Sequence, residues 1–202
     1  MDWSRRNLCL LFTPELCLGE PWWTLDTALA AGVPLVQWRV KSSDPDGLRR
    51  CMAACAACDV PVIVNDHIDL AVESRAAGVH VGQDDTPVAT ARGRLADGQI
   101  LGVSTHDIEQ ARQAHAAGAD YIGLGPCHPT ETKGYDAGLA RAALADVLAS
   151  ATIPVFAIGG ITADNLPPLA DLGFRHFAVS SAILAADMPD AAVERMLDAI
   201  GG

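Results

Sequence analysis

The sequence predicts an α/β protein folded as a single (β/α)₈ TIM barrel, with residues 1–202 forming one domain. Short apolar runs alternate with helical stretches along the chain, and this alternation indicates βαβ units with a parallel sheet. A second observation is a repeated phrase of small residues and a glycine directly before a β-rich run. The phrase occurs at Gly32, Gly78, Gly118 and Gly173. Glycine tolerates the left-handed conformation in which many helices end, so each phrase predicts the passage from a helix into a strand.

Eight runs qualify as strands, and eight β/α units in 202 residues fit a compact barrel. The second, fourth, sixth and eighth runs each follow one of the four glycine phrases. The first, third, fifth and seventh are runs of four to six mainly apolar residues. In order, the predicted strands span residues 8–13, 34–39, 61–64, 79–81, 100–103, 120–124, 154–158 and 176–180. Helices fit between these strands and after the last one.

A doubly wound sheet is the competing arrangement. Such a sheet would carry a glycine-rich phosphate-binding fingerprint directly after an early strand. The nearest match is GLGPCH at residues 123–128, which follows the sixth predicted strand and lacks the third glycine. The sequence therefore favours the barrel.

Composition narrows the class of protein. Apolar residues make up 50% of the chain and charged residues 19%, which excludes a disordered protein and allows a sizeable core. A formal charge of −11 argues against a general nucleic-acid binder, which would present a basic patch. No apolar run approaches the roughly 18 residues of a membrane span. The run after Arg6 ends too soon, at Thr13-Pro14-Glu15, for a signal peptide. We expect a cytoplasmic protein that binds neither nucleic acid nor membrane.

Polar residues gather at the carboxyl ends of the predicted strands, where barrel enzymes carry their chemistry. One polar strand end is explained by a helix N-cap, but a succession of seven is not. The polar ends read QWRVK at 37–41, ND at 65–66, GQDD at 82–85, STH at 104–106, PCHPTETKG at 126–134, GGI at 159–161 and SS at 180–181.

One group of polar residues combines two cations with an amide. Gln37, Arg39 and Lys41 alternate along the second predicted strand, so their side chains are expected on one side of it. Two cations and an amide that converge in this way suit a polyanion such as diphosphate. A simple ion pair at the end of the strand is the alternative.

Two carboxylates stand at neighbouring strand ends. Asp66 and Asp85 have no cation beside them in sequence, and Mg²⁺ favours one or two carboxylates together with substrate phosphate and water. The alternative for Asp66 is an N-cap, because a helix is expected to begin beside it. We expect the two carboxylates to hold a metal ion.

Small residues follow the last two predicted strands. Barrels commonly build a phosphate site here from backbone N–H groups, and glycine lets a ligand approach the chain closely. Gly159-Gly160 and Ser180-Ser181 occupy these positions. Tight turns that lead into two helices are the alternative.

Three cysteines have a spacing that also ligates iron–sulfur clusters. Cys51, Cys55 and Cys58 lie in an alanine-rich helical stretch, where this spacing predicts one buried helix face instead. The other cysteines, at positions 9, 17 and 127, show no disulfide framework, which is consistent with a reducing compartment.

Of the six histidines, His106 and His128 stand at strand ends and are candidate acid or base groups. The remaining histidines are expected to pack in the fold or to face solvent. These are His67, His80, His115 and His176.

Seven motifs resemble, in order and spacing, the thiamine phosphate synthase family. They read VQWRVK, VNDHIDLA, GVHVGQDD, LGVSTH, DYIGLGPCHPTETK, AIGGI and AVSSAI, and the match runs from about residue 8 to the C-terminus. The resemblance implies a (β/α)₈ barrel that joins hydroxymethylpyrimidine diphosphate to a thiazole phosphate with Mg²⁺ and releases diphosphate. It further implies loss of diphosphate first, followed by capture of the pyrimidine cation by the thiazole nitrogen.

The resemblance also assigns residues by position. It implies catalytic roles for Arg39, Lys41, Ser104 and Lys133, and metal ligation by Asp66 and Asp85. The implied substrate-binding residues are Gln37, Trp38, Arg39, Val40, Lys41, Asn65, Ser104, Thr130, Glu131, Thr132, Lys133, Gly160, Ser180 and Ser181. This sequence departs from the family pattern at Trp38, Val40, Cys127-His128 and Ser180, and in a short stretch after Lys133. The last two adjoin the thiazole side.

Two rival functions remain open. A thiazole tautomerase of the same superfamily would use His106 as an acid or base, whereas a non-catalytic binder of thiamine precursors would keep only the barrel. Both carboxylates and the segment Thr130–Lys133 are present, which favours the synthase. A homo-oligomer also stays open, since Trp22-Trp23 would suit either an interface or the core.

Overall fold

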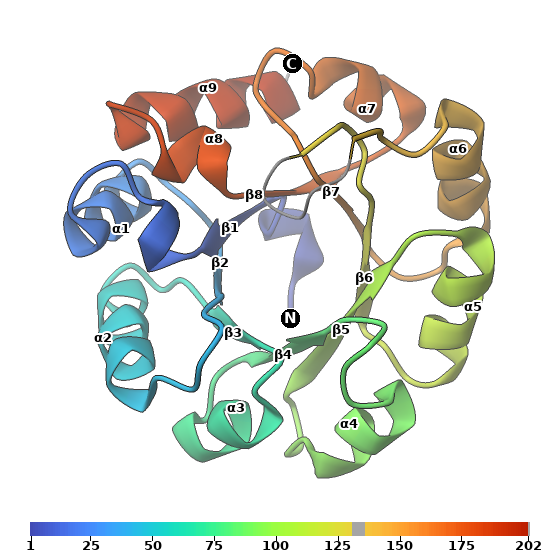
Figure 1. Ribbon diagram of the computed structural model, residues 1–202, viewed down its shortest axis with the longest axis horizontal. Helices are drawn as coiled ribbons and strands as arrows, with labels where there is room; N and C mark the ends of the chain where they lie inside the picture. The colour runs from blue at the N-terminus through green and yellow to red at the C-terminus, as the bar shows by residue number, and fades with distance from the viewer. Residues whose placement is uncertain (131–135, 202) are drawn as a thin grey trace.

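The computed structural model describes residues 1–130 and 136–201 and confirms the predicted barrel (Figure 1). Eight parallel strands pair in sequence order, and β1 also pairs with β8, so the sheet closes on itself. The strands are β1 (Leu8–Phe12), β2 (Leu35–Trp38), β3 (Val62–Asn65), β4 (Gly78–Val81), β5 (Ile100–Thr105), β6 (Tyr121–Leu124), β7 (Val155–Ile158) and β8 (His176–Val179). Each lies within two residues of its predicted bounds.

Helices surround the strands as an outer ring (Figure 1). They are α1 (Pro21–Ala30), α2 (Pro45–Ala56), α3 (Ile68–Ser74), α4 (Val88–Arg94), α5 (Ile108–Ala116), α6 (Arg141–Ser150), α7 (Pro167–Leu172), α8 (Ser181–Leu184) and α9 (Pro189–Gly201), with short 3₁₀ helices η1 (Trp3–Arg5) and η2 (Pro14–Leu16). Carboxylates cap several of them: Asp44 accepts from Gly47 N and Asp107 from Gln110 N. None of the helices in the described part of the chain is long and apolar enough to cross a membrane.

The glycine phrases behave as predicted in three of four cases. Gly32, Gly118 and Gly173 have φ values of 100°, 98° and 121°, as expected where a helix gives way to a strand. The prediction is wrong for Gly78, which lies inside β4, and Arg75 takes the left-handed conformation with a φ of 57°. A Cβ on Gly78 would stand 2.1 Å from Ile100 O, so this glycine serves close strand packing.

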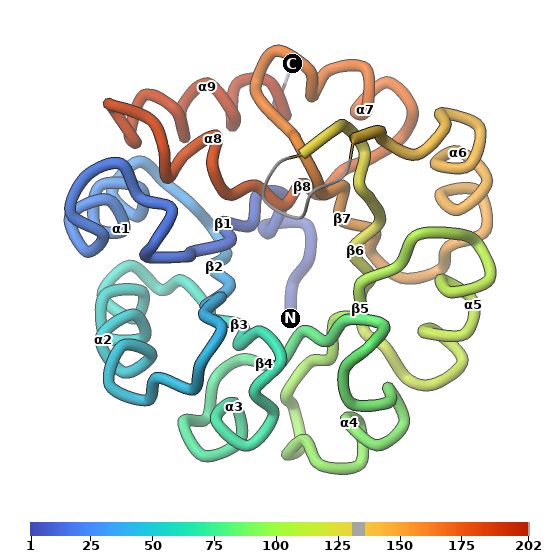
Figure 2. The backbone as a smooth tube through the Cα atoms, in the orientation of Figure 1, coloured from blue at the N-terminus to red at the C-terminus, as the bar shows by residue number. Residues whose placement is uncertain are grey.

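Two hydrophobic clusters stabilise the barrel. The larger fills the layer between the strands and the helices, and the smaller fills the barrel interior. The interior cluster consists of Cys9, Leu11, Leu35, Ile63, Ile100, Tyr121, Phe156 and Ala178. Trp3 of η1 packs against it, with its ring 5.2 Å from that of Tyr121 and 5.9 Å from that of Phe156. Viewed down the barrel, the amino-terminal segment lies within the ring of strands (Figure 2). The amino end of the interior is therefore closed, and a cavity is left at the carboxyl end.

The cysteine stretch requires a correction. Cys51 and Cys55 are fully buried on the inner face of α2, as predicted. The helix ends at Ala56, however, so Cys58 lies beyond it and is exposed. No group of three or more metal-binding side chains occurs in residues 1–130 and 136–201, which leaves the iron–sulfur alternative without support there.

Candidate active site at the carboxyl end of the barrel

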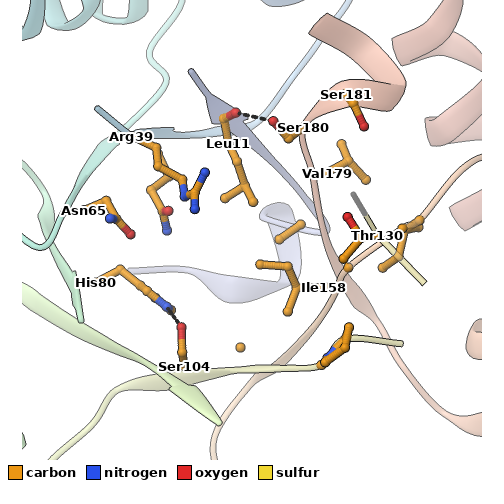
Figure 3. Close-up of a pocket in the computed structure, with 18 of the residues that line it drawn as sticks. Leu11, Arg39, Asn65, His80, Ser104, Thr130, Ile158, Val179, Ser180 and Ser181 are labelled. Carbon is orange, nitrogen blue, oxygen red and sulfur yellow. Dashed lines mark hydrogen bonds between the residues drawn. The ribbon is translucent and has the colours of Figure 1, made fainter. Parts of the chain in front are cut away.

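A pocket opens where the strands end (Figure 3), and the empty space in and at the mouth of this pocket, open solvent included, is about 820 Å³. Each of the eight strands contributes at least one residue to its lining, and the other lining residues lie in the segments that follow strands β2, β5, β6, β7 and β8. The sequence-predicted residues that line it are Gln37, Arg39, Asn65, Ser104, Thr130, Gly160, Ser180 and Ser181. The predicted residues Glu131, Thr132 and Lys133 lie outside the described residues.

One side of the site, here named the charged side, comprises Arg39 and Asn65, which line the pocket, together with Asp66 and Asp85. The two carboxylates do not line the pocket themselves; Asp66 directly follows Asn65 and lies within electrostatic reach of Arg39. Arg39 follows the last residue of β2, but its N–H donates to Phe12 O at 2.9 Å, so the pairing with β1 continues by one residue. Its guanidinium points into the pocket in Figure 3. Among the described residues, no carboxylate forms an ion pair with Arg39, which leaves the guanidinium available to an anion.

The carboxylates of the charged side meet across two loops. Asp66 has a left-handed backbone with a φ of 63°, and its N–H donates to His80 O at 2.8 Å. Asp85 Oδ2 accepts from Gly82 N at 2.7 Å, which fixes the loop after β4. Partial desolvation, followed by the hydrogen bond and the negative charge of Asp85, raises the pKa of Asp66 to about 6. The two carboxyl groups are therefore close enough to share a proton or a cation.

This geometry favours Asp66 as one of two metal-binding carboxylates over Asp66 as the N-cap of α3. The N-cap position of α3 is His67, and it makes no side-chain capping bond. Two adjacent carboxylates are a donor set that fits a hard divalent cation, and the raised pKa of Asp66 reflects the closeness of Asp85. The described residues contribute no third metal-binding side chain, so such an ion would complete its shell with water or substrate oxygen.

The opposite wall, here named the glycine–serine side, is formed by Gly159, Gly160, Ser180 and Ser181. The two glycines have φ values of 96° and 60°. A Cβ on Gly160 would stand 2.3 Å from Pro129 O, so only glycine fits where the loops after β6 and β7 meet. Ser180 Oγ donates to Leu11 O at 3.1 Å, and Ser181 begins α8. This wall presents backbone and hydroxyl groups, which suits a phosphate.

The structure corrects the placement of three predicted residues. Side chains alternate along β2, so Trp38 faces the helices while Gln37 faces the interior. Trp38 is 1% exposed and stacks on Trp22 with ring centroids 6.1 Å apart. Val40 packs against the outer core, and Lys41 is exposed and does not line the pocket. The alternation that groups Lys41 with Gln37 and Arg39 fails because the strand ends at Trp38.

The histidines at the pocket are not the two that the sequence predicts: His106 and His80 line it, whereas His128 does not. His106 lines the pocket, and its Nδ1 lies 2.5 Å from Gly125 O. His128 does not line the pocket and packs against Gly160. His80 is buried, as expected of a packed histidine, but it also lines the pocket floor and contacts Ser104. The sequence signal for this position is alternation along β4, because Val79 and Val81 face the helices and His80 between them must face the barrel interior.

Fold and pocket together define a class of protein: a (β/α)₈ barrel with a polar site at the carboxyl ends of its strands, as in barrel enzymes. The family model described as "Thiamine monophosphate synthase" matches residues 8–183. The chain belongs to this family.

Named relatives support the assignment. The thiamine-phosphate synthase of Geobacillus kaustophilus (strain HTA426) is 43% identical over 188 residues, covering 87% of this chain and 83% of that protein. The thiamine-phosphate synthase of Parasynechococcus marenigrum (strain WH8102) is 41% identical over 207 residues, covering 98% of this chain. A third, from Synechococcus sp. (strain WH7803), is 42% identical over 86% of this chain. The chain spans 58% and 50% of the length of these last two relatives.

Solved structures agree with the fold. Thiamine phosphate pyrophosphorylase from Pyrococcus furiosus has a TM-score of 0.88 at 28% identity, covering 98% of this chain and 96% of that one. A 3-hexulose-6-phosphate synthase has a TM-score of 0.72 at 20% identity, covering 96% of this chain and 99% of that one, and shares the fold alone.

Proposed function

We propose that this protein is a thiamine phosphate synthase, a transferase that joins hydroxymethylpyrimidine diphosphate to hydroxyethylthiazole phosphate. The products are thiamine phosphate and diphosphate. Family membership supports this proposal, but the observation that carries it is the two-sided pocket. Its charged side suits a diphosphate with a divalent cation, and its glycine–serine side suits a second, singly phosphorylated substrate.

The reaction is a dissociative substitution at the methylene carbon of the pyrimidine. The C–O bond to diphosphate breaks, and its electron pair departs with the diphosphate. The lone pair of the thiazole nitrogen then forms the new C–N bond to the same carbon. No nucleophile from the protein is needed, so the protein acts by stabilising charge and by orienting two substrates.

Charge stabilisation falls to the charged side of the pocket. The Arg39 guanidinium is available to the departing diphosphate, and Ser104 and Lys133 are its proposed further contacts. Asn65 and Gln37 line the same side and are proposed to orient the pyrimidine diphosphate. Lys41 is exposed outside the pocket, so its contribution is limited to long-range attraction of anions.

Asp66 and Asp85 are the residues that would hold Mg²⁺. Their mutual repulsion, which contributes to the raised pKa of Asp66, would be relieved by a bound cation. When bound there, Mg²⁺ supplies positive charge that neutralises the departing diphosphate. Asp85 is held by the Gly82 N–H, so its position is set before any ion binds.

The thiazole phosphate is assigned to the glycine–serine side. Gly159 and Gly160 expose backbone at close range, and Ser181 starts a helix at the rim. Thr130 lines the pocket next to this wall and is a proposed further contact, together with Glu131 and Thr132. Placing the two substrates on opposite walls brings the thiazole nitrogen toward the pyrimidine carbon.

The test is turnover of the purified full chain with both substrates and MgCl₂. Thiamine phosphate and diphosphate should form in equal amounts, and EDTA should stop the reaction until excess Mg²⁺ is added. Isomerisation of the thiazole phosphate without the pyrimidine substrate, abolished by His106→Asn, would identify a tautomerase instead. Tight binding of a thiazole phosphate without any turnover would identify a binding protein. Either of these two results overturns the proposal.

A further inference from the structure

A chain of polar side chains runs from the closed interior of the barrel to the pocket floor. His80 Nδ1 lies 3.0 Å from Tyr121 Oη. His80 Nε2 lies 2.9 Å from Ser104 Oγ, and Figure 3 marks this second contact with a dashed line. The side chain of Gln37 lies close enough to the Tyr121 hydroxyl to influence its pKa. His80 is 6% exposed and Tyr121 is 4% exposed, so these contacts are sheltered from water. The mechanism above uses Ser104 but gives no role to His80 or Tyr121.

The strands are built to allow this chain of contacts. Register pairs His80 of β4 with Gly102 of β5, and Gly102 with Tyr121 of β6. A Cβ on Gly102 would stand 2.3 Å from Tyr121 Oη, so the missing side chain is what lets the phenol cross β5 to reach the imidazole. Gly123 of β6 also lies beside His80, but its Cβ position is 3.5 Å from His80 Cε1, an ordinary contact distance. Gly102 is therefore the glycine that leaves the space for this contact.

Two proton arrangements satisfy these distances, and they differ in what Ser104 offers the pocket. In the first, Tyr121 donates to His80 Nδ1, and the Nε2–H of His80 donates to Ser104 Oγ. The Ser104 hydroxyl then keeps its own proton for a ligand. In the second, Ser104 donates to Nε2 and presents only lone pairs. An anionic ligand selects the first arrangement, because lone pairs would repel its oxygens.

The environment of Tyr121 is consistent with the first arrangement. Burial raises the pKa of its hydroxyl well above the ordinary value, so the hydroxyl keeps its proton at neutral pH. Gln37 acts on the same hydroxyl in the opposite sense and lowers its pKa, as an amide N–H that faces the Tyr121 oxygen does. With an N–H on that side, the Tyr121 proton is directed at the imidazole.

We propose that His80 and Tyr121 are positioning residues that hold Ser104 as a hydrogen-bond donor toward the leaving diphosphate. This inference rests on the proposed function for the identity of the anion. Tyr121 fixes the tautomer of His80, and His80 occupies a lone pair of Ser104, so the serine proton turns into the pocket. Neither residue needs to touch substrate.

A double-mutant cycle tests the coupling. Ser104→Ala should lower kcat about 100-fold, the scale of losing one oriented donor to a developing negative charge. Tyr121→Phe keeps the ring and should lower kcat about 3- to 10-fold with little change in KM, the scale of one hydrogen bond. The double variant should be no slower than Ser104→Ala, since Tyr121 acts through Ser104. A double variant slowed by the product of both factors would overturn the proposal.

Thr24→Val is the matched control. Thr24 is 1% exposed and its Oγ1 donates to Glu20 O within α1, away from the pocket. This variant loses a buried hydroxyl, as Tyr121→Phe does, so it should lose comparable thermal stability and keep wild-type kcat. A loss of kcat in Thr24→Val equal to that in Tyr121→Phe would assign the effect to stability and overturn the positioning role.

The tautomer of His80 gives a readout that needs no substrate. The ¹⁵N shifts of the His80 ring, assigned by comparison with His80→Gln, should report the neutral form protonated at Nε2. An Nδ1-protonated ring would overturn the proposal whatever the kinetics. Absence of synthase turnover in the wild-type protein would instead refute the proposed function, and the ring signals would still report the arrangement of protons.

Discussion

The two walls of the pocket present different chemistry and depend on the sequence in different ways. The charged side acts through the ends of side chains, such as the guanidinium of Arg39 and the carboxylates of Asp66 and Asp85. The glycine–serine side acts through backbone, and Gly160 is required there because Pro129 leaves no space for a Cβ. A substitution on the charged side changes charge and leaves the chain in place, whereas one on the glycine–serine side moves the chain. The two walls should therefore fail differently when altered.

The largest effect is expected from the carboxylates of the charged side. Asp66→Asn and Asp85→Asn should each lower kcat about 100-fold, because each removes a proposed ligand of the Mg²⁺ whose positive charge would neutralise the departing diphosphate. The double variant should cost less than the product, since the two carboxylates act as a unit. Asp84→Asn, which alters an exposed neighbour in the same loop, is the control and should keep wild-type activity. Full activity of both single variants in the presence of a chelator would remove the metal site.

A smaller effect of another kind is expected from Gly160→Ala. The added Cβ meets Pro129 O, so the loops after β6 and β7 must separate. We expect KM for the thiazole phosphate to rise about tenfold, the equivalent of about 1.4 kcal/mol, with a smaller change in kcat. Gly98→Ala is the control that separates the cost of a positive φ from the clash with Pro129. Gly98 also has a positive φ, of 83°, but nothing lies within 4 Å of its Cβ position. The Gly98→Ala variant should lose stability but keep the wild-type KM for the thiazole phosphate. An unchanged KM in Gly160→Ala would end the assignment of phosphate to this wall.

The carboxylates of the charged side should also affect the thermal stability of the protein when no metal ion is bound. The pKa of Asp66 in the folded protein is about 6, above the ordinary 3.8. The stability cost of this shift is therefore absent below pH 3.8, grows as pH rises from 3.8 to 6 and is complete above 6. Solvent screening keeps this cost on the order of 1 kcal/mol. At pH 8 in EDTA, Asp66→Asn should therefore raise Tm by about 2–4 °C, and asparagine tolerates the left-handed φ.

Thermal unfolding at pH 8 and pH 4, with EDTA and with Mg²⁺, measures this effect. The advantage of Asp66→Asn should shrink toward pH 4, and Mg²⁺ should stabilise the wild-type protein but not the variant. A variant that melts below the wild-type protein at pH 8 in EDTA would contradict the carboxylate repulsion.

The smallest effect on activity is expected outside both walls, in α2. Cys51→Ala and Cys55→Ala each remove a buried thiol and should cost about 1 kcal/mol of stability, with kcat unchanged. Cys58→Ala alters an exposed side chain and should change neither quantity. Denaturant unfolding and steady-state kinetics measure these two quantities. The cysteine variants then show how much activity changes when stability alone is lowered, for comparison with variants in the two walls. Iron and acid-labile sulfide in anaerobically purified protein would contradict this packing role.

The sequence predicts the barrel because strands buried on both faces must be apolar throughout. The run at β1 and the glycine phrases before β2, β6 and β8 carry this information locally. The position of the site follows from the same pattern, since parallel strands bring their carboxyl ends to one rim. Arg39, Asn65 and Gly160 were placed at the pocket by this reasoning alone.

Predictions failed where a local pattern was extended past the end of its element. Lys41 continues the alternation of β2 in sequence, but the strand has ended at Trp38. Cys58 continues the helical spacing of Cys51 and Cys55, but α2 has ended at Ala56. Periodicity does not mark its own end, because termination depends on loop contacts made by residues elsewhere in the chain.

By itself, the sequence determines the order of the β/α units, the end of the barrel that bears polar residues, and the chemical character of each wall. These properties follow from local spacing and residue type. The tertiary structure alone decides that His80 reaches both Tyr121, 41 positions away, and Ser104, 24 positions away. Closure of the sheet sets β4, β5 and β6 in register, and Gly102 leaves the space between them. Such contacts depend on which side chains are absent as much as on those present, and no local pattern encodes that.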